Sequence, residues 1–404
     1  MRFLSILALV LMSPSALAQP TATVAVAFDL RASEVRIAEG LADRATARAV
    51  TADDPVRIAS ISKLVVALGV MRLVERGTLD LDRDVSDYLG WSMRHPGFPD
   101  TAITLRLLLS HRAGLLDGDD DYIVPVGERL RDRLEPPRLW DPAHAPGSDW
   151  FHYANMNFPV VASVMEAATD ERFDRLMARE VFEPLGLKAC FNWSGCDPAT
   201  LARAVVLYRA SGEVARDDLN GVVPACPGVP AADGSCDMAG YVPGTNGAIF
   251  SPQGGLRISM TDLAKIGQML LAGGRGFLSP AAFAQLTRPH WRSDRDNGLG
   301  EDGRAGGVFR AYGLAVHTIG TARNEAMPGD DLFGDGLERI GHSGEAYGLR
   351  SGLWVDPVGG TGLAFFTTAV PDDEPRGTSA FTQREERIVR RAREPRATES
   401  PPPR

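Results

Sequence analysis

The chain has 404 residues, 44% of them apolar and 24% charged, which is the composition of an ordinary globular protein. Its formal net charge of −9 argues against nucleic acid or an anionic membrane surface as the main partner. Only three of its 43 basic residues are lysines, so arginine supplies the other 40. A lysine can lose its proton when its surroundings lower its pKa, whereas arginine effectively cannot. The lysines are Lys63, Lys188 and Lys265, and Lys63 is a candidate for chemistry because it follows a serine by three residues at the head of an apolar run.

Residues 1–18 are typical of a secretory signal peptide. A short basic start precedes the apolar run FLSILALVLM and the small-residue site ALA at 16–18. The run is too short to cross a bilayer, and no later segment is long and apolar enough to do so. We therefore expect an exported protein, periplasmic or secreted, with one main domain over 19–394 and a disordered tail over 395–404.

The first half of that domain is predicted to begin with strands and continue with helices. Residues 21–30 and 34–43 are strand-length apolar runs joined by a polar turn, which predicts a hairpin. A helix is predicted from Ser60 to about Gly77, and because it is apolar nearly all round we expect it to be buried. Residues 78–187 carry repeated helical patterns and are predicted to form a helical lobe with loops.

The segment 188–246 is predicted to be an insertion stapled by disulfides. It is rich in Gly and Pro and carries all four cysteines of the chain. An even count in an exported protein favours two disulfides, and pairing in sequence order closes the shortest loops. A zinc site is the alternative, but the tight C-x2–4-C spacing of such sites is absent. The cysteines are Cys190, Cys196, Cys226 and Cys236.

The C-terminal part is predicted to return to a helix, three strands and a last helix. A helix is expected over 260–274, strands over 339–343, 351–357 and 362–370, and a helix over 379–392. Strands at both ends of the chain predict an antiparallel sheet built from both termini. Helices flank this sheet and a helical lobe is inserted in it, so the expected class is α+β.

Ser60 and Lys63 form the first candidate reactive pair. Three positions apart on a helix, they lie on one face within reach of each other. Ser60 at the helix start would lie near backbone N–H groups that favour a developing oxyanion. Lys63 in an apolar helix would lose hydration, which favours its neutral, proton-accepting form. The alternative is a surface serine beside a salt-bridged lysine, because S-x-x-K alone is a common pattern.

Two further segments carry candidate groups. Tyr153 precedes Asn155 just before a predicted helix, where the phenol could relay protons and the amide could hold a substrate carbonyl. The alternative is a packed aromatic followed by a capping asparagine. The strand with His342-Ser343-Gly344 has a glycine that permits close backbone approach, as in strands that pair with an extended substrate. His342 could bind an anionic group there, or be a structural histidine.

Taken in order, these motifs resemble those of the penicillin-recognising serine hydrolases. Ser60-Ile61-Ser62-Lys63 resembles S-x-x-K, Tyr153-Ala154-Asn155 resembles Y-x-N, and His342-Ser343-Gly344 resembles K/H-x-G. The flanking segments LLLSHRAGL, EPLGL and GGLRISMTDLAKIGQMLLAGG are also similar to that family, so the similarity covers about residues 22–370. The family includes class C β-lactamases, D-alanyl-D-alanine carboxypeptidases and β-lactamase-like esterases.

The resemblance implies a β-lactamase/transpeptidase-like fold and hydrolysis through an acyl-enzyme on Ser60. It implies that Lys63 and Tyr153 share the base and acid roles, and that Asn155 positions the substrate. The implied oxyanion hole is the backbone N–H of Ser60 and of Glu345. The implied substrates are D-Ala-D-Ala peptides, small esters or, since histidine replaces the lysine usual in class C enzymes, less readily β-lactams. A class C-type β-lactamase and a non-catalytic peptidoglycan-binding or penicillin-binding protein are the alternatives.

No cofactor or metal is predicted. The acidic run DGDDDY at 117–122 lacks EF-hand spacing and is interpreted as a solvated loop. The remaining histidines show no metal-binding pattern such as H-E-x-x-H and are interpreted as structural. GHSGE at 341–345 is a near miss for a nucleophile elbow and lacks the strand-to-helix context. The sequence does not determine the oligomeric state.

Overall fold

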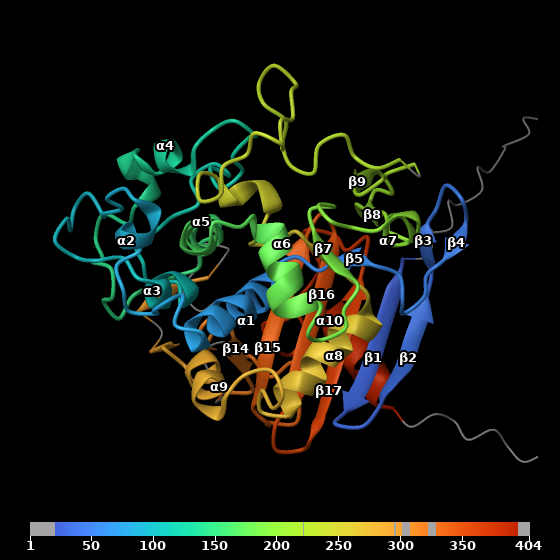
Figure 1. Ribbon diagram of the computed structural model, residues 1–404. Coiled ribbons are helices and arrows are strands. Elements are labelled where there is room, and N and C mark those ends of the chain that lie inside the picture. The colour runs from blue at the N-terminus through green and yellow to red at the C-terminus, as the bar shows by residue number, and fades with distance from the viewer. Residues whose placement is uncertain (1–20, 221, 295, 301–307, 322–328, 395–404) are drawn as a thin grey trace, which may run out of the picture.

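The computed structural model describes residues 21–220, 222–294, 296–300, 308–321 and 329–394. The predicted signal peptide and the predicted tail lie outside the described residues. An eight-stranded sheet with helices on its two faces lies beside a region of helices and loops that contains α2 (Ser86–Leu89), α3 (Leu105–Leu109), α4 (Leu130–Leu134) and α5 (Asn157–Thr169) (Figure 1). Neighbouring strands of this sheet run antiparallel, in the order β11-β13-β14-β15-β16-β17-β1-β2. Their bounds are β1 Thr23–Asp29, β2 Ser33–Glu39, β11 Trp291–Arg292, β13 Ala311–Tyr312, β14 His317–Ile319, β15 Arg339–Ala346, β16 Leu349–Asp356 and β17 Thr361–Thr367.

The N-terminal and C-terminal strands of the chain meet near one edge of this sheet, where only β2 lies beyond β1. β1 pairs with β17 in a register that sets Thr23 opposite Thr367, and the two hydroxyls are 2.9 Å apart. Alternate residues of β1 point to opposite faces. Val24 packs in the large core toward the helices, whereas Ala25 packs in a smaller core on the other face. The predicted sheet from both termini is confirmed.

Helices cover both faces of the sheet. α8 (Met260–Leu271) lies against β17, β1 and β16, and Ser259 caps it by accepting from the N–H of Asp262. α10 (Gln383–Arg393) packs on β1 and β2, and its side chains share the smaller core with Ala25. α1 (Ile61–Glu75) contacts β15 and β16 and is buried along nearly its whole length, as its apolar sequence predicted.

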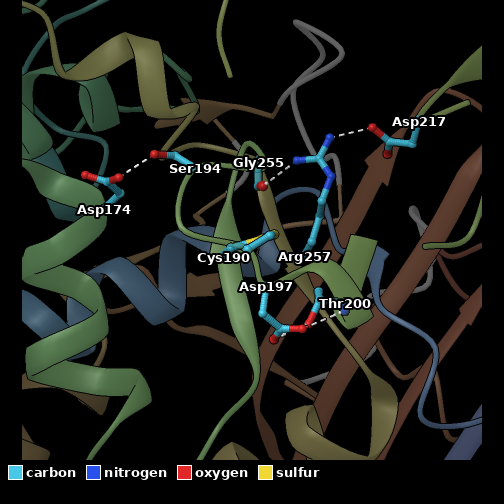
Figure 2. The surroundings of a disulfide bond; sticks show 9 residues. Asp174, Cys190, Ser194, Asp197, Thr200, Asp217, Gly255 and Arg257 are labelled. Atoms are coloured by element: carbon cyan, nitrogen blue, oxygen red, sulfur yellow. Dashed lines mark hydrogen bonds and ion pairs between the residues drawn. A yellow bond between two sulfur atoms is a disulfide. The ribbon is translucent and has the colours of Figure 1, made fainter. Parts of the chain in front are cut away.

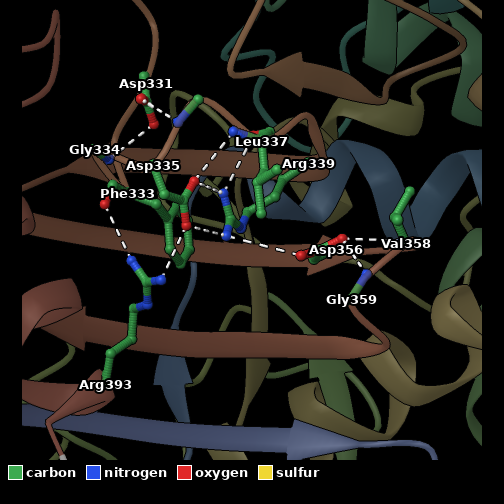
Figure 3. Close-up of polar contacts among 11 residues, drawn as sticks. Asp331, Phe333, Gly334, Asp335, Leu337, Arg339, Asp356, Val358, Gly359 and Arg393 are labelled. Atoms are coloured by element: carbon green, nitrogen blue, oxygen red, sulfur yellow. Dashed lines mark hydrogen bonds and ion pairs between the residues drawn. The ribbon is translucent and has the colours of Figure 1, made fainter.

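A polar cluster ties the end of α10 to the start of β15 (Figure 3). Arg339 donates to both carboxylate oxygens of Asp335, at 2.8 and 2.7 Å, and Arg393 donates to the same carboxylate at 2.9 Å. These bonds, that from Arg339 foremost, lower the pKa of Asp335 to about 2. The Arg339 guanidinium also lies 3.9 Å from the ring centre of Phe333. The cluster fixes the lower end of the strand that reaches the site described below.

The predicted helical lobe contains one long helix and several short ones. α5 (Asn157–Thr169) is its longest element, and loops make up much of residues 78–156, where the sequence suggested more helix. Short helices are favoured there because each apolar patch spans barely one turn before Gly or Pro interrupts it. The remaining elements are α2 Ser86–Leu89, α3 Leu105–Leu109, α4 Leu130–Leu134, η1 Pro137–Leu139, β6 Phe151–His152, α6 Phe173–Met177, η2 Ala178–Phe182 and α9 Pro280–Thr287.

The cysteine segment, residues 188–246, is held by two disulfides. Cys190 pairs with Cys196 and Cys226 with Cys236, which confirms the disulfide prediction over the zinc alternative. β7 (Ala189–Phe191) joins β10 (Leu256–Ile258) and β5 (Val56–Arg57) in a small sheet next to the start of α1. Figure 2 shows the first disulfide beside Arg257 of β10. The other short elements are β3 Leu41–Asp43, β4 Arg48–Ala49, α7 Pro198–Ala202, β8 Leu207–Tyr208, β9 Val214–Arg216, η3 Gly247–Phe250 and β12 Gly298–Leu299.

Candidate active site

Ser60 stands at the first turn of α1, directly after a strained residue. Ala59 has φ of 49°, in the left-handed region that costs a residue with a Cβ about 1 kcal/mol or more. Ser60 caps the helix by position, but its side chain makes no capping bond, so the hydroxyl is turned to other partners. It is 6% exposed and lines two pockets described below. The strained turn therefore presents a mostly buried hydroxyl at the junction of two open spaces.

Lys63 lies one turn further along α1 with its amine among neutral oxygen atoms. Nζ is 2.8 Å from Ser60 Oγ, 2.8 Å from Asn155 Oδ1 and 2.9 Å from the carbonyl oxygen of Gln253. The amide and carbonyl oxygens can only accept, whereas the serine hydroxyl can also donate. A neutral amine satisfies this arrangement by donating to the two oxygens and accepting from Ser60. The geometry is thus suited to moving the Ser60 proton onto Lys63.

Asp117 determines which end of the Asn155 amide faces Lys63. Asn155 Nδ2 donates to Asp117 Oδ2 at 3.0 Å, and the N–H of Met156 donates to Asp117 Oδ1 at 2.8 Å. Because a carboxylate only accepts, the amide oxygen must point the other way, toward Lys63. The interpretation of run 117–122 as a solvated loop was therefore wrong for Asp117, and also for Asp121, which is buried and accepts two hydrogen bonds from Arg138. No local signal in the sequence could have linked Asp117 to a residue 38 positions away.

Tyr153 forms a wall beside Lys63. Its ring stacks between His111, with ring centres 4.3 Å apart, and Phe309, at 4.7 Å. Lys63 Nζ lies 4.8 Å from the tyrosine ring centre, and Tyr153 shares a pocket with Ser60. His111 also accepts from the N–H of Ala154 through Nδ1, and burial holds its pKa well below the ordinary value. This neutral imidazole positions the Tyr153 turn, in agreement with its interpretation as structural.

His342 lies behind the pocket wall, contrary to the expectation that its charge meets a substrate anion. It is fully buried, and its Nδ1 is 2.5 Å from the carbonyl oxygen of Ser343, so Nδ1 must donate. Nε2 then accepts from the Tyr312 hydroxyl at 2.8 Å. Burial first, and the nearby Lys63 second, lower the pKa of His342 to about 3. The imidazole is neutral at physiological pH, so the structure favours the alternative of a structural histidine over a side chain that binds an anionic group.

The strand after His342 runs against the segment that leads into Ser60. A Cβ on Gly344 would lie 2.3 Å from the carbonyl oxygen of Ile58, so only glycine fits there. Ser351 of the neighbouring strand donates to the same carbonyl at 3.0 Å. Ser343, Gly344 and Glu345 line a pocket of about 620 Å³ with Ser60 and Tyr153. The fold therefore brings Ser343 and Gly344 of the predicted third motif next to Ser60, but the His342 side chain lies outside the pocket.

Two pockets of different chemistry meet at Ser60 and Glu345. The first pocket has aromatic walls and more acidic than basic side chains: Tyr153, Phe309, Phe381, Glu345, Asp372, Glu374, Glu385, Arg350 and Arg376. The second pocket, of about 310 Å³, lies toward the cysteine segment, and its lining includes Arg57, Asn155, Asn192, Arg216 and Tyr347. Arg57, Gln253 and Asp117 were not singled out from the sequence, because each reaches the site only through the fold.

Neither a metal centre nor a membrane span is found in the part of the chain that the structure describes. There, His, Cys, Asp and Glu side chains do not gather in groups of three or more that could hold a metal ion. Within the same residues, the helices are too short or too polar to cross a membrane.

The fold and the Ser-Lys pair define a β-lactamase/transpeptidase-like protein. A D-amino acid amidase from Ochrobactrum anthropi SV3, solved with D-phenylalanine, superposes with a TM-score of 0.63 at 20% identity, covering 93% of both chains. A class C β-lactamase from Rhodobacter sphaeroides gives a TM-score of 0.62 at 18% identity, covering 92% of both. At these sequence identities, the similarity to the two solved structures shows a shared fold only.

The sequence itself establishes the family. The model of the beta-lactamase family matches residues 16–386, so the chain belongs to the beta-lactamase family, as its motifs suggested. Esterase EstB of Burkholderia gladioli is 33% identical over 186 residues, which are 41% of this chain and 46% of the esterase. The D-alanyl-D-alanine-carboxypeptidase/endopeptidase AmpH of Escherichia coli K12 is 29% identical over 143 residues, 34% of this chain and 36% of that protein. The chain thus spans less than half the length of these curated relatives.

Proposed function

We propose that this protein is an exported serine hydrolase that forms an acyl-enzyme on Ser60, with esters and D,D-peptides as the preferred substrate classes. The observation that carries the proposal is the 2.8 Å contact between Lys63 Nζ and Ser60 Oγ inside a cage of neutral acceptors. The similarity to an esterase and to a D,D-carboxypeptidase supports the substrate classes. Two disulfides support export, because such bonds persist in oxidising compartments.

The first half of the reaction moves one proton and one acyl group. Lys63 accepts the proton of Ser60 as Oγ bonds to the substrate carbonyl carbon. The carbonyl oxygen gains negative charge, for which we assign the backbone N–H groups of Ser60 and Glu345 as donors. The tetrahedral intermediate then expels the alcohol or amine. That leaving group takes the proton from Lys63, with Tyr153 assigned as the relay, and Asn155 holds the substrate.

The second half returns the enzyme to its starting state. A water molecule gives up a proton to the same Lys63 and Tyr153 pair while its oxygen attacks the acyl carbon. The Ser60 ester bond breaks, Oγ regains a proton, and the carboxylic acid leaves. His342 is neutral and buried, so it supplies no fixed positive charge to this step, whereas class C enzymes have a lysine at that motif position. We therefore rank β-lactam turnover below ester or peptide hydrolysis.

Intact-mass measurement of the trapped adduct tests the proposal. The purified protein is mixed with a short-chain nitrophenyl ester and, separately, with a fluorescent penicillin, and is quenched within the first turnover. We expect an acyl adduct on wild type and none on Ser60→Ala, with loss of ester hydrolysis. An adduct that persists on Ser60→Ala, or hydrolysis that survives the substitution, would overturn the role of Ser60. Binding of penicillin without any adduct would favour the non-catalytic alternative.

A further inference from the structure

Three guanidinium groups, those of Arg57, Arg257 and Arg216, gather at the wall of the second pocket around the carboxylate of Asp217. Arg57 of β5 and Arg257 of β10 are directly opposite in the strand register, and both are buried. Like charges placed opposite each other in a sheet are destabilising. Asp217 is the carboxylate they share: it accepts from Arg257 and lies 3.7 Å from Nε of Arg57 (Figure 2 shows the Arg257 contact).

Arg216 adds a third guanidinium next to this shared carboxylate. It ends β9, precedes Asp217 and is exposed in the pocket lining. Burial is the main cause that lowers the pKa of Arg57 and of Arg257, the latter to about 9. The charge of Arg216 lowers both further, because the three guanidinium groups repel one another. An anion placed among them would relieve this repulsion.

Arg57 and Arg216 both lie close to the ring of Tyr347, and all three residues line the second pocket. Their guanidinium carbons lie 5.6 and 5.5 Å from the ring centre of Tyr347, which also lines the pocket. Arg57 is held in place by donating to Asn192 Oδ1 and to the Gly254 carbonyl, both at 3.0 Å. Such a pre-positioned pair of guanidiniums suits bidentate recognition of a carboxylate.

The other carboxylates near the pocket are engaged with other groups. Asp120 lines the pocket and hydrogen-bonds Tyr122, Glu345 is ion-paired with Arg350, and Asp117 accepts from Asn155. Asp217 is the carboxylate that contacts the arginine cluster. Arg57 and Arg216 therefore keep donor groups available for an anionic substrate group in the second pocket.

We propose that Arg57 and Arg216 form a carboxylate subsite beside Ser60, so that the substrate of this enzyme carries a carboxylate on the part that lies over the second pocket. The inference rests on the proposed acyl-enzyme function and narrows its substrate class. Arg216 is the better position for a test substitution because its side chain is exposed, whereas Arg57 is part of the buried arginine cluster.

Two pairs of esters test the subsite. In the first pair, nitrophenyl hemiglutarate carries a carboxylate in the acyl chain and nitrophenyl butyrate is its neutral match. In the second pair, 4-butyryloxybenzoate carries a carboxylate in the leaving group and phenyl butyrate is its neutral match. We expect wild type to favour one charged ester in kcat/KM over its neutral match. Arg216→Gln should lower that ratio by about tenfold or more, and Arg216→Lys should recover part of it.

Arg275→Gln is the matched control. It removes the same charge from an exposed arginine that lines neither pocket, so the ratio should stay at the wild-type value. A ratio that is equal in wild type and Arg216→Gln for both charged esters would overturn the subsite while ester hydrolysis still supports the acyl-enzyme. Failure of all esters to acylate Ser60 would overturn the proposed function, and the subsite with it.

Discussion

Arg57 stands three residues before Ser60 and Lys63 three residues after it, and the surroundings of these two buried cations differ. Arg57 shares the carboxylate of Asp217 with a second arginine, whereas the Lys63 amine contacts a hydroxyl, an amide oxygen and a carbonyl oxygen. A guanidinium remains charged and therefore needs a compensating charge when buried. An amine among neutral oxygens can be accommodated with or without its proton. Arg57 therefore remains charged in the wall of the site, while Lys63 is available for chemistry.

The largest effect should come from replacing Lys63 with arginine, so that the Lys63 position has the chemistry of Arg57. Lys63→Arg places a group that cannot accept a proton beside Ser60, and its fork would also crowd the three oxygens. Loss of a positioned base removes about 10²–10⁴ of rate, so we expect a fall of that order in acylation by an ester or penicillin, measured by stopped flow. Lys265→Arg, at an exposed lysine paired with Asp262, is the control and should acylate normally. A variant that unfolds at the wild-type temperature and acylates at a near-normal rate would show that Lys63 is not the base.

Removing the compensating charge should affect stability at the arginine cluster. Asp217→Asn leaves two buried guanidiniums opposite each other without their carboxylate, and breaking such a buried pair costs about 3–5 kcal/mol. We expect a loss of that order in the free energy of unfolding, measured in urea. Asp218→Asn changes the exposed neighbour and should change it by less than about 0.5 kcal/mol. Equal stability of the two variants would mean that the arginines are not compensated by Asp217.

A smaller effect on catalysis is expected from loosening the support of Asn155. Asp117→Asn replaces a carboxylate that only accepts with an amide that can also donate, so the Asn155 side chain can turn its nitrogen toward Lys63. A charge-assisted bond contributes about 1.5–3 kcal/mol, so acylation should slow roughly 10-fold to 100-fold. Because Asn155 is also assigned to hold the substrate, KM should rise while kcat falls, and an unchanged circular dichroism spectrum separates positioning from a general loss of structure. Asp119→Asn in the same loop serves as the control, and an equal loss of rate in both variants would contradict the role of Asp117.

The smallest effect on catalysis concerns His342, a third buried group near the same serine, whose substitution should change how stability depends on pH. Its pKa is about 3 in the folded protein and near 6.5 when unfolded, so between these values the unfolded chain binds a proton that the folded chain refuses. The free energy of unfolding should therefore fall as pH drops from about 6.5 toward 3. His342→Gln should make that fall shallower in urea titrations at several pH values, although buried His111 and His317 contribute in the same direction. An unchanged pH slope would show that His342 does not resist protonation.

The elements and motifs that follow a local period were predictable from the sequence. The helix expected from Ser60 begins at Ile61, and the three C-terminal strands lie within a few residues of their predicted bounds. Tyr153 and Asn155 stand before α5 as expected. These predictions succeed because side-chain period and helix or strand signals are short-range properties.

The supporting residues could not be predicted, because they act across long sequence separations. Asp117 meets Asn155 from another loop, and Gln253 contributes a backbone carbonyl that any residue would have. Arg57 is one of 40 arginines, and only the strand register shows that it faces Arg257. His342 was assigned to the substrate from its motif, but burial, which the motif does not encode, placed it behind the wall.

The pairing of β1 with β17 has a consequence for how the chain acquires its structure. Thr23 and Thr367, which meet across these strands, are 344 residues apart in the sequence, so closing that loop costs entropy before any contact compensates for it. Long-range pairing of this kind slows folding. During synthesis, β1 has only β2 beside it until β17 has emerged, and its other edge remains open to association with other chains. The sheet on which the serine depends is therefore completed late, and a chain that ends before residue 361 would leave β1 with an unpaired edge.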